Sequence, residues 1–285
     1  MTGRPSMPVR RGVLWMSLGV LVVVVGLVLL ARGGDDGPPA PTCRIVGPPS
    51  PPSAASDSGG LRIVEQGYSR LLANATTVSM GVVLENTTDR VAYRTRVTFD
   101  VLGESGESLV WERHRPWLVQ EVPVILPGAR VSVGDAVALN DRAPRPAASV
   151  ARISITPVVT QWLPAGDGHT GLAPVTAKPV PGSSQRDEQG TGSVRYISES
   201  ANCADLFSRG ASLVFRDESG RIVGGNVDNQ RHLSACDAGT GHQALAHAGL
   251  DTIPASADLD RTDVTVYCDF SYPVRTGESG EPINL

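Results

Sequence analysis

The residues of this sequence that can perform chemistry are few, and they lack the spacing of known catalytic motifs. The chain has no Gly-x-Ser-x-Gly elbow, no Walker phosphate loop and no His-Glu-x-x-His. The segments 103–106 and 277–280 both read Gly-Glu-Ser-Gly, a composition that is ordinary in turns. We therefore expect no catalytic residue and no bound cofactor.

The nearest approach to a metal site is a group of residues late in the chain. It consists of His232, Cys236, Asp237, His242 and His247. Imidazole, thiolate and carboxylate groups this close in sequence can converge on zinc or copper. However, His247 alternates with Ala246 and Ala248 and is expected to face solvent, while Cys236 is expected to be oxidised. We predict no metal site. An extracytoplasmic metal-dependent or hydrolytic enzyme that uses these residues is the alternative.

One cluster of aromatic and basic side chains has the composition of a binding site. It consists of Trp111, Arg113, His114, Arg115 and Trp117. Indole faces together with guanidinium groups can hold a planar, sugar or peptide ligand. The simpler interpretation, which the sequence alone favours, is a strand followed by a turn at Pro116, with both tryptophans packed onto a sheet.

The charge distribution argues against one class of partner. All 29 acidic residues lie beyond Arg32, whereas four of the 25 basic residues lie at or before it, so the rest of the chain has a net charge of −8. An acidic body of this kind repels phosphate backbones, and we expect no nucleic-acid partner.

A hydrophobic segment near the start of the chain has the length of a membrane span. Residues 12–31 carry no charge. At about 1.5 Å of rise per residue, they match the roughly 30 Å of a hydrocarbon core. Three arginines precede the segment and two aspartates follow it closely, so we predict a single transmembrane helix in the cell membrane, with residues 1–11 cytoplasmic and the body extracytoplasmic. A cleaved signal peptide is the alternative.

Glycines along this segment are candidates for contact with another membrane helix. Gly12, Gly19 and Gly26 recur every seven residues, and missing side chains allow close helix approach. The simpler explanation is that glycine is common in such helices.

Proline-rich segments divide the extracytoplasmic part. Residues 32–60 are predicted to form a stalk, because prolines with serine and glycine cannot build a core. Residues 164–191 have a similar composition and are predicted to link two modules, 61–163 and 192–274. Residues 275–285 are expected to form a C-terminal tail.

Apolar residues alternate with polar ones in the first module, which is typical of strands. One such set is Val78, Met80, Val82 and Leu84. The next is Val91, Tyr93, Val97, Phe99 and Val101. No comparable segment has helical periodicity, so an all-β fold is predicted.

The second module repeats the spacing of the first. Asn86 lies thirteen residues before Phe99, and Asn202 lies thirteen residues before Phe215. Matching sets of strand and turn signals predict tandem sandwiches.

The order of signals also resembles a known family. A strand, an Asn-Thr turn, a strand ending near Phe, a Glu-Ser-Gly turn at 104–106 or 218–220 and further strands resemble the FxLYD-type immunoglobulin-like modules of bacterial envelope proteins. The resemblance covers 61–163 and, more weakly, 192–274. It implies tandem immunoglobulin-like sandwiches behind the transmembrane helix, with a non-enzymatic extracytoplasmic role.

The four cysteines all lie beyond the membrane segment, in a compartment that favours disulfides. In an immunoglobulin-like sandwich, Cys203 and Cys268 would approach from the two sheets, which leaves Cys43 to pair with Cys236. A local Cys203–Cys236 bridge is the alternative.

These expectations combine into an anchored, non-catalytic binding or scaffold protein. Its partner would be an envelope protein or cell-wall component, and the lipid bilayer would hold its transmembrane helix. An accessory subunit that contacts a membrane complex mainly through that helix is a further alternative.

Overall fold

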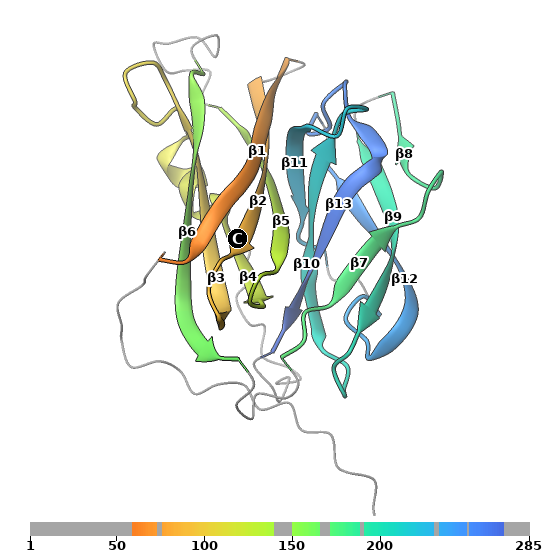
Figure 1. The fold of residues 1–285 in the computed structure, drawn as a ribbon. Coiled ribbons are helices and arrows are strands. Elements are labelled where there is room, and N and C mark those ends of the chain that lie inside the picture. The colour runs from red at the N-terminus through yellow and green to blue at the C-terminus, as the bar shows by residue number, and fades with distance from the viewer. Residues whose placement is uncertain are drawn as a thin grey trace, which may run out of the picture. The chain divides into compact units, whose positions relative to one another are not determined.

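The computed structural model describes residues 59–72, 76–139, 150–165, 172–188, 191–230, 234–249 and 251–270, and these residues form antiparallel sheets with one short helix (Figure 1). The all-β prediction is confirmed. The predicted membrane segment, nearly all of the stalk and the C-terminal tail lie outside these residues. Among the described residues, no helix is long and apolar enough to cross a membrane.

The first half of the described chain forms two three-stranded sheets, with the orders β1-β2-β5 and β4-β3-β6. The strands are β1 (Leu61–Leu72), β2 (Thr76–Asn86), β3 (Arg90–Leu102), β4 (Val119–Ile125), β5 (Arg130–Ala138) and β6 (Arg152–Pro164). A short 3-10 helix, η1 (Glu112–Leu118), joins β3 to β4.

The second half forms a sheet with the order β11-β10-β13 and another with the order β12-β9-β7, in which β8 also pairs with β9. The strands are β7 (Thr176–Pro179), β8 (Gln185–Arg186), β9 (Gly192–Ser200), β10 (Phe207–Arg216), β11 (Ile222–Asp228), β12 (Gly239–Ala248) and β13 (Asp258–Asp269). If β7 and β8 count as one interrupted strand, the second half repeats the strand order of the first. Both short strands lie within the predicted linker.

The inward faces of the strands follow the alternation seen in the sequence. Met80 and Leu84 are fully buried in the first core, and Phe99 and Phe215 have exposed fractions of only 2% and 0%. The equivalent spacing of these two phenylalanines therefore corresponds to equivalent burial in the two halves.

Strand β3 departs from a simple alternation at Arg94, whose φ is 54°. Before Arg94, Val91 and Tyr93 pack with the core cluster of the second half. After it, Val97 and Phe99 pack in the core of the first half. One strand therefore serves two cores, although its sequence predicts a single apolar face.

The β1-β2-β5 sheet contacts the β11-β10-β13 sheet at a junction lined by glycines, where the backbones approach closely. A Cβ placed on Gly134 would lie 1.9 Å from the carbonyl oxygen of Leu213, and one on Gly225 would lie 2.3 Å from that of Met80. Neither position has room for a side chain, so glycine is required there.

Two serines join the facing backbones across this junction. Ser79 Oγ donates to the carbonyl of Gly225 at 2.8 Å and accepts from its N–H at 2.9 Å. Ser212 Oγ accepts from the N–H of Gly134 at 2.5 Å. Each hydroxyl thereby satisfies backbone groups that the sheet contact would otherwise leave unpaired.

The two halves also share core residues. Tyr267 belongs to β13 of the second half, yet it is fully buried in the core cluster of the first. Both halves belong to one compact unit. The second half is therefore attached to the first by a packed interface as well as by the chain that connects them.

Candidate functional site

The aromatic and basic cluster lies on η1, which buried residues hold at both ends. Val110 before η1 and Leu118 at its end are buried in the first core. The N–H of His114 donates to the carbonyl of Trp111 at 2.8 Å, and Pro116 restricts the backbone within the helix. The segment between the two anchors is thereby fixed on the surface.

The aromatic rings of η1 form a stack. The ring centroids of Trp111 and His114 are 5.8 Å apart, those of His114 and Trp117 are 4.8 Å apart, and both pairs have an interplanar angle of 19°. The guanidinium of Arg113 lies 4.1 Å from the centroid of Trp111. The structure thus connects four of the five predicted residues through successive contacts, and Arg115 lies on the same short helix.

The surroundings of Trp117 differ from the packed strand that the sequence favoured. Its exposed fraction is 55%, and among the described residues Ile63 is the one other large hydrophobic side chain that is exposed. The strand interpretation of this segment is wrong, because Pro116 and two closely spaced buried anchors produce a 3-10 helix instead. Trp117 therefore presents an indole surface to solvent.

The positive charges of this patch are not neutralised. Within the described part of the chain, neither Arg113 nor Arg115 forms an ion pair, and both are exposed. Other arginines are paired, for example Arg94 with Glu121 at 2.8 Å. The patch is consequently a local cationic surface on an acidic body.

The candidate metal ligands do not converge in the described residues. Cys236 forms a disulfide bond and cannot act as a thiolate ligand. His242 Nε2 forms a hydrogen bond with the carbonyl oxygen of Ala238 at 3.0 Å. His247 is exposed, as its alternation with alanines predicts. His232 lies outside the described residues. The part of the chain that the structure describes contains no group of three metal-binding side chains.

The disulfide pairing differs from the expectation. Cys236 is bonded to Cys268, so the predicted Cys203–Cys268 and Cys43–Cys236 pairs are wrong, as is the alternative Cys203–Cys236 pair. Cys203 is also disulfide-bonded, while Cys43 lies outside the described residues. Cys236 lies in the turn before β12, and its Cα is 5.8 Å from that of Cys268 on β13. The prediction failed because the sequence does not show that this turn lies against β13.

A ligand-sized groove of about 450 Å³ lies at the contact between the halves, and sequence analysis missed it. Its walls come from β4, β5, β7 and β13, each an outer strand of its sheet. Val264, Val266 and Phe270 contribute apolar surface to it. Because the groove depends on how four strands from two halves are arranged, no local sequence signal identifies it.

A second feature that sequence analysis missed is a buried carboxyl group. Asp135 on β5 is 2% exposed, and burial raises its pKa to about 7. It accepts hydrogen bonds from Gln120 Nε2 at 2.8 Å and from the N–H of Ala136 at 2.7 Å. The sequence did contain a signal for this burial, because Asp135 occupies the same face of the strand as Val131, Val133 and Val137.

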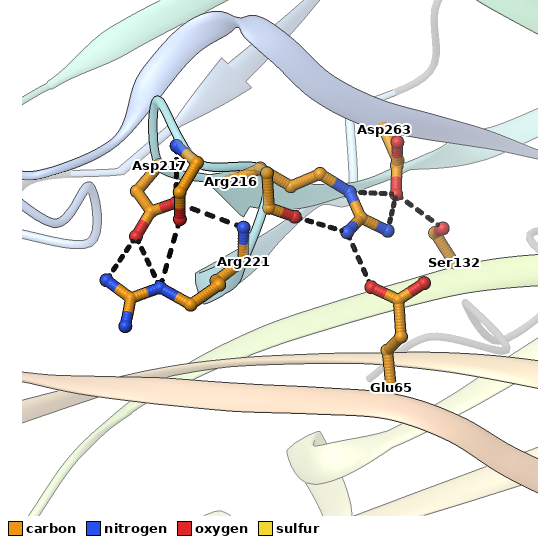
Figure 2. A network of polar contacts seen from close by, with 8 residues as sticks. Glu65, Ser132, Arg216, Asp217, Arg221 and Asp263 are labelled. Carbon is orange, nitrogen blue, oxygen red and sulfur yellow. Dashed lines mark hydrogen bonds and ion pairs between the residues drawn. The ribbon is translucent and has the colours of Figure 1, made fainter.

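Three other carboxylates near the junction, those of Glu65, Asp217 and Asp263, are paired with arginines (Figure 2). Arg216 donates to Glu65 on β1 at 2.6 Å and to Asp263 on β13 at 2.9 Å, so it joins the two halves. Asp263 also accepts a bond from Ser132 on β5 at 2.8 Å. This network fixes the relative position of four strands, β1, β5, β10 and β13.

The turn beside this network stabilises its own carboxylate. Asp217 accepts bonds from the hydroxyl of Ser219 and from the side chain and N–H of Arg221. These bonds, led by that from Ser219, lower the pKa of Asp217 to about 2. Its role is to close the turn between β10 and β11.

No protein-family model, no curated protein and no solved structure matches the chain.

Proposed function

We propose that this chain is a membrane-anchored, extracytoplasmic binding or scaffold protein of the cell envelope. In this proposal, residues 12–31 anchor it, and two immunoglobulin-like sandwiches form the body. The surface patch of Trp111, Arg113, His114, Arg115 and Trp117, here called the tryptophan patch, captures an envelope protein or cell-wall component.

Three features support the tandem part of the proposal. The two halves repeat one strand order, and Phe99 and Phe215 are buried at equivalent spacings. The turns that follow β3 and β10 also match, because Gly106 and Gly220 have φ values of 83° and 84°. The resemblance to FxLYD-type modules adds an extracytoplasmic, non-catalytic role to this architecture.

The observation that carries the binding proposal is the exposure of Trp117 at the end of an ordered stack. Exposed tryptophans and arginines are enriched among the residues that dominate binding energy at interfaces. A ring already held by His114 loses little rotamer freedom when a ligand covers it.

The test is co-sedimentation of the full-length protein, held in lipid nanodiscs, with purified cell-envelope fragments. Trp117→Ala should weaken capture by about 1 to 4 kcal/mol, as expected for an interface anchor. Ile63→Ala, which truncates the other exposed large hydrophobic side chain, is the matched control and should leave capture unchanged. Undiminished capture by a normally folded Trp117→Ala variant would contradict the proposal.

A further inference from the structure

The stack that ends at Trp117 is assembled by contacts within the protein. The guanidinium of Arg113, the indole of Trp111, the imidazole of His114 and the indole of Trp117 form one continuous series of ring contacts. Buried Leu118 anchors the segment next to Trp117. The exposed indole is therefore a rigid, flat platform that is suited to a flat apolar surface.

The platform is flanked by cations that have no carboxylate partner in the described residues. Arg113 and Arg115 are both exposed, and Glu112 is the acidic residue next to them on η1. Arginine pairs well with carboxylate and phosphate groups, often through two parallel hydrogen bonds. The side chains of the patch thus match a ligand that combines a flat ring with negative charge.

The net charge of the body affects which anionic ligand can approach the patch. The chain beyond Arg32 carries a net charge of −8, so an extended anionic surface such as a lipid bilayer is repelled by most of the molecule. The same repulsion acts on an anionic polymer, except where a short segment of a flexible chain meets the cationic patch while the rest extends away from the body. The local positive charge of the patch therefore favours a flexible anionic polymer over an extended membrane surface.

We propose, on the basis of the binding function above, that the ligand of the tryptophan patch is an anionic polysaccharide. The C–H face of one sugar ring stacks on the indole of Trp117, since the face of an aromatic ring is negatively polarised. A carboxylate or phosphate on the same polymer pairs with Arg115, and Arg113 extends the cationic surface beside Trp111.

The experiment measures binding of the full-length protein, in nanodiscs of neutral lipid, to defined polymers. Polygalacturonate supplies carboxylates, phosphomannan supplies phosphates, and dextran is the neutral comparison. We expect at least one anionic polymer to bind more tightly than dextran, with an affinity that falls as salt is raised. Trp117→Ala and Arg115→Gln should each reduce that affinity about tenfold, whereas Trp117→Phe should retain most of it.

Matched variants separate the patch from general surface effects. Ile63→Ala removes another exposed apolar side chain, and Arg152→Gln removes an exposed arginine on β6, so both should bind as the parent does. Equal binding to dextran, or no binding to either anionic polymer, overturns the polysaccharide assignment. Trp117-dependent binding to phosphatidylglycerol vesicles in place of the polymers also overturns it, in favour of a lipid surface.

The two proposals fail in different ways. If the polymers do not bind while envelope capture still depends on Trp117, the ligand class is wrong and the binding function stands. If Trp117→Ala leaves envelope capture unchanged, the binding function itself is wrong at this site.

Discussion

Asp135 lies on the inward face of β5, where water cannot solvate a charged carboxylate. Burial raises its pKa to about 7 in the folded protein, compared with an ordinary value of 3.8. Between these two values the folded protein holds a proton that the unfolded chain has released. The free energy of unfolding therefore falls as pH rises from about 4 to about 7, and above that it no longer changes on account of this group.

Replacing Asp135 by Asn should remove this pH dependence. At pH 8 the variant should be more stable than the parent by about 2 to 4 kcal/mol, because no charge is buried. Gln120 Oε1 has no hydrogen-bond partner among the described residues, so a rotated Gln120 amide can accept from the new Asn side chain. Urea unfolding at pH 5, 6, 7 and 8 measures the effect.

The control for this comparison is Asp89→Asn, which changes an exposed carboxylate in the turn after β2. Its stability difference from the parent should stay small across the same pH series. If the stability difference between the parent and Asp135→Asn is the same at pH 5 and pH 8, the carboxyl of Asp135 does not titrate between these pH values in the folded protein.

The turns after β3 and β10 show how a short motif fixes an element boundary. Gly106 donates its N–H to the carbonyl of Gly103 at 3.0 Å, and Gly220 donates its N–H to that of Asp217 at 2.8 Å. A Cβ at either glycine would meet nothing within 4 Å, so a substitution there is opposed by backbone conformation alone.

Gly220→Ala should lower the free energy of unfolding by about 1 kcal/mol, because φ at this position is 84°. Gly220→Asn should recover part of the loss, since asparagine tolerates this conformation better than alanine. Urea midpoints provide the measurement. Gly249→Ala is the matched control, because its Cβ would make only an ordinary contact, and a similar loss there would mean that φ is not the cause.

The bond between Cys236 and Cys268 joins the turn before β12 to the closing strand β13. It closes a loop with a sequence separation of 32 residues. Replacing both cysteines by alanine should destabilise the protein by about 2 to 4 kcal/mol. Peptide mapping without reduction should recover the Cys236–Cys268 peptide, and a Cys203–Cys268 peptide would restore the pairing expected from sequence.

At the level of elements, the sequence predicted what depends on local patterns. The apolar face of β2 and the Glu-Ser-Gly turns follow from residue types a few positions apart. The change of face at Arg94 does not, because Val91 and Tyr93 turn toward a core that consists mostly of residues from the second half of the chain. For the same reason, the exposure of Trp117 depends on anchors that no local pattern reveals.

At the level of the whole molecule, the halves should unfold together. Two modules joined by a proline-rich linker, as the sequence predicts, would each be expected to fold independently. The glycine junction and the burial of Tyr267 in the opposite core lead us to expect one cooperative transition instead. Differential scanning calorimetry of the full-length protein should show a single peak for the body, and two independent peaks would contradict the shared core.

Gly134→Ala is the direct test of the junction. The new Cβ would lie 1.9 Å from the carbonyl oxygen of Leu213, so the sheets must separate, at a cost of about 1 to 3 kcal/mol or more. The transition temperature should fall accordingly, or the single peak should split. The same substitution at Gly249 serves again as the control, and equal effects at the two sites would indicate that the sheets are not in close contact.

The serine bonds at the junction have a mechanical consequence. Ser79 and Ser212 each hold backbone groups of the facing sheet, and Arg216 bridges β1 and β13. A pulling force between the start of β1 and Trp117 stays within the first half, because η1 lies between β3 and β4. The force therefore loads the hydrogen-bonded pairing of β1 with β2 and leaves the junction bonds unloaded. The second half is expected to stay attached to the first while a ligand pulls on Trp117.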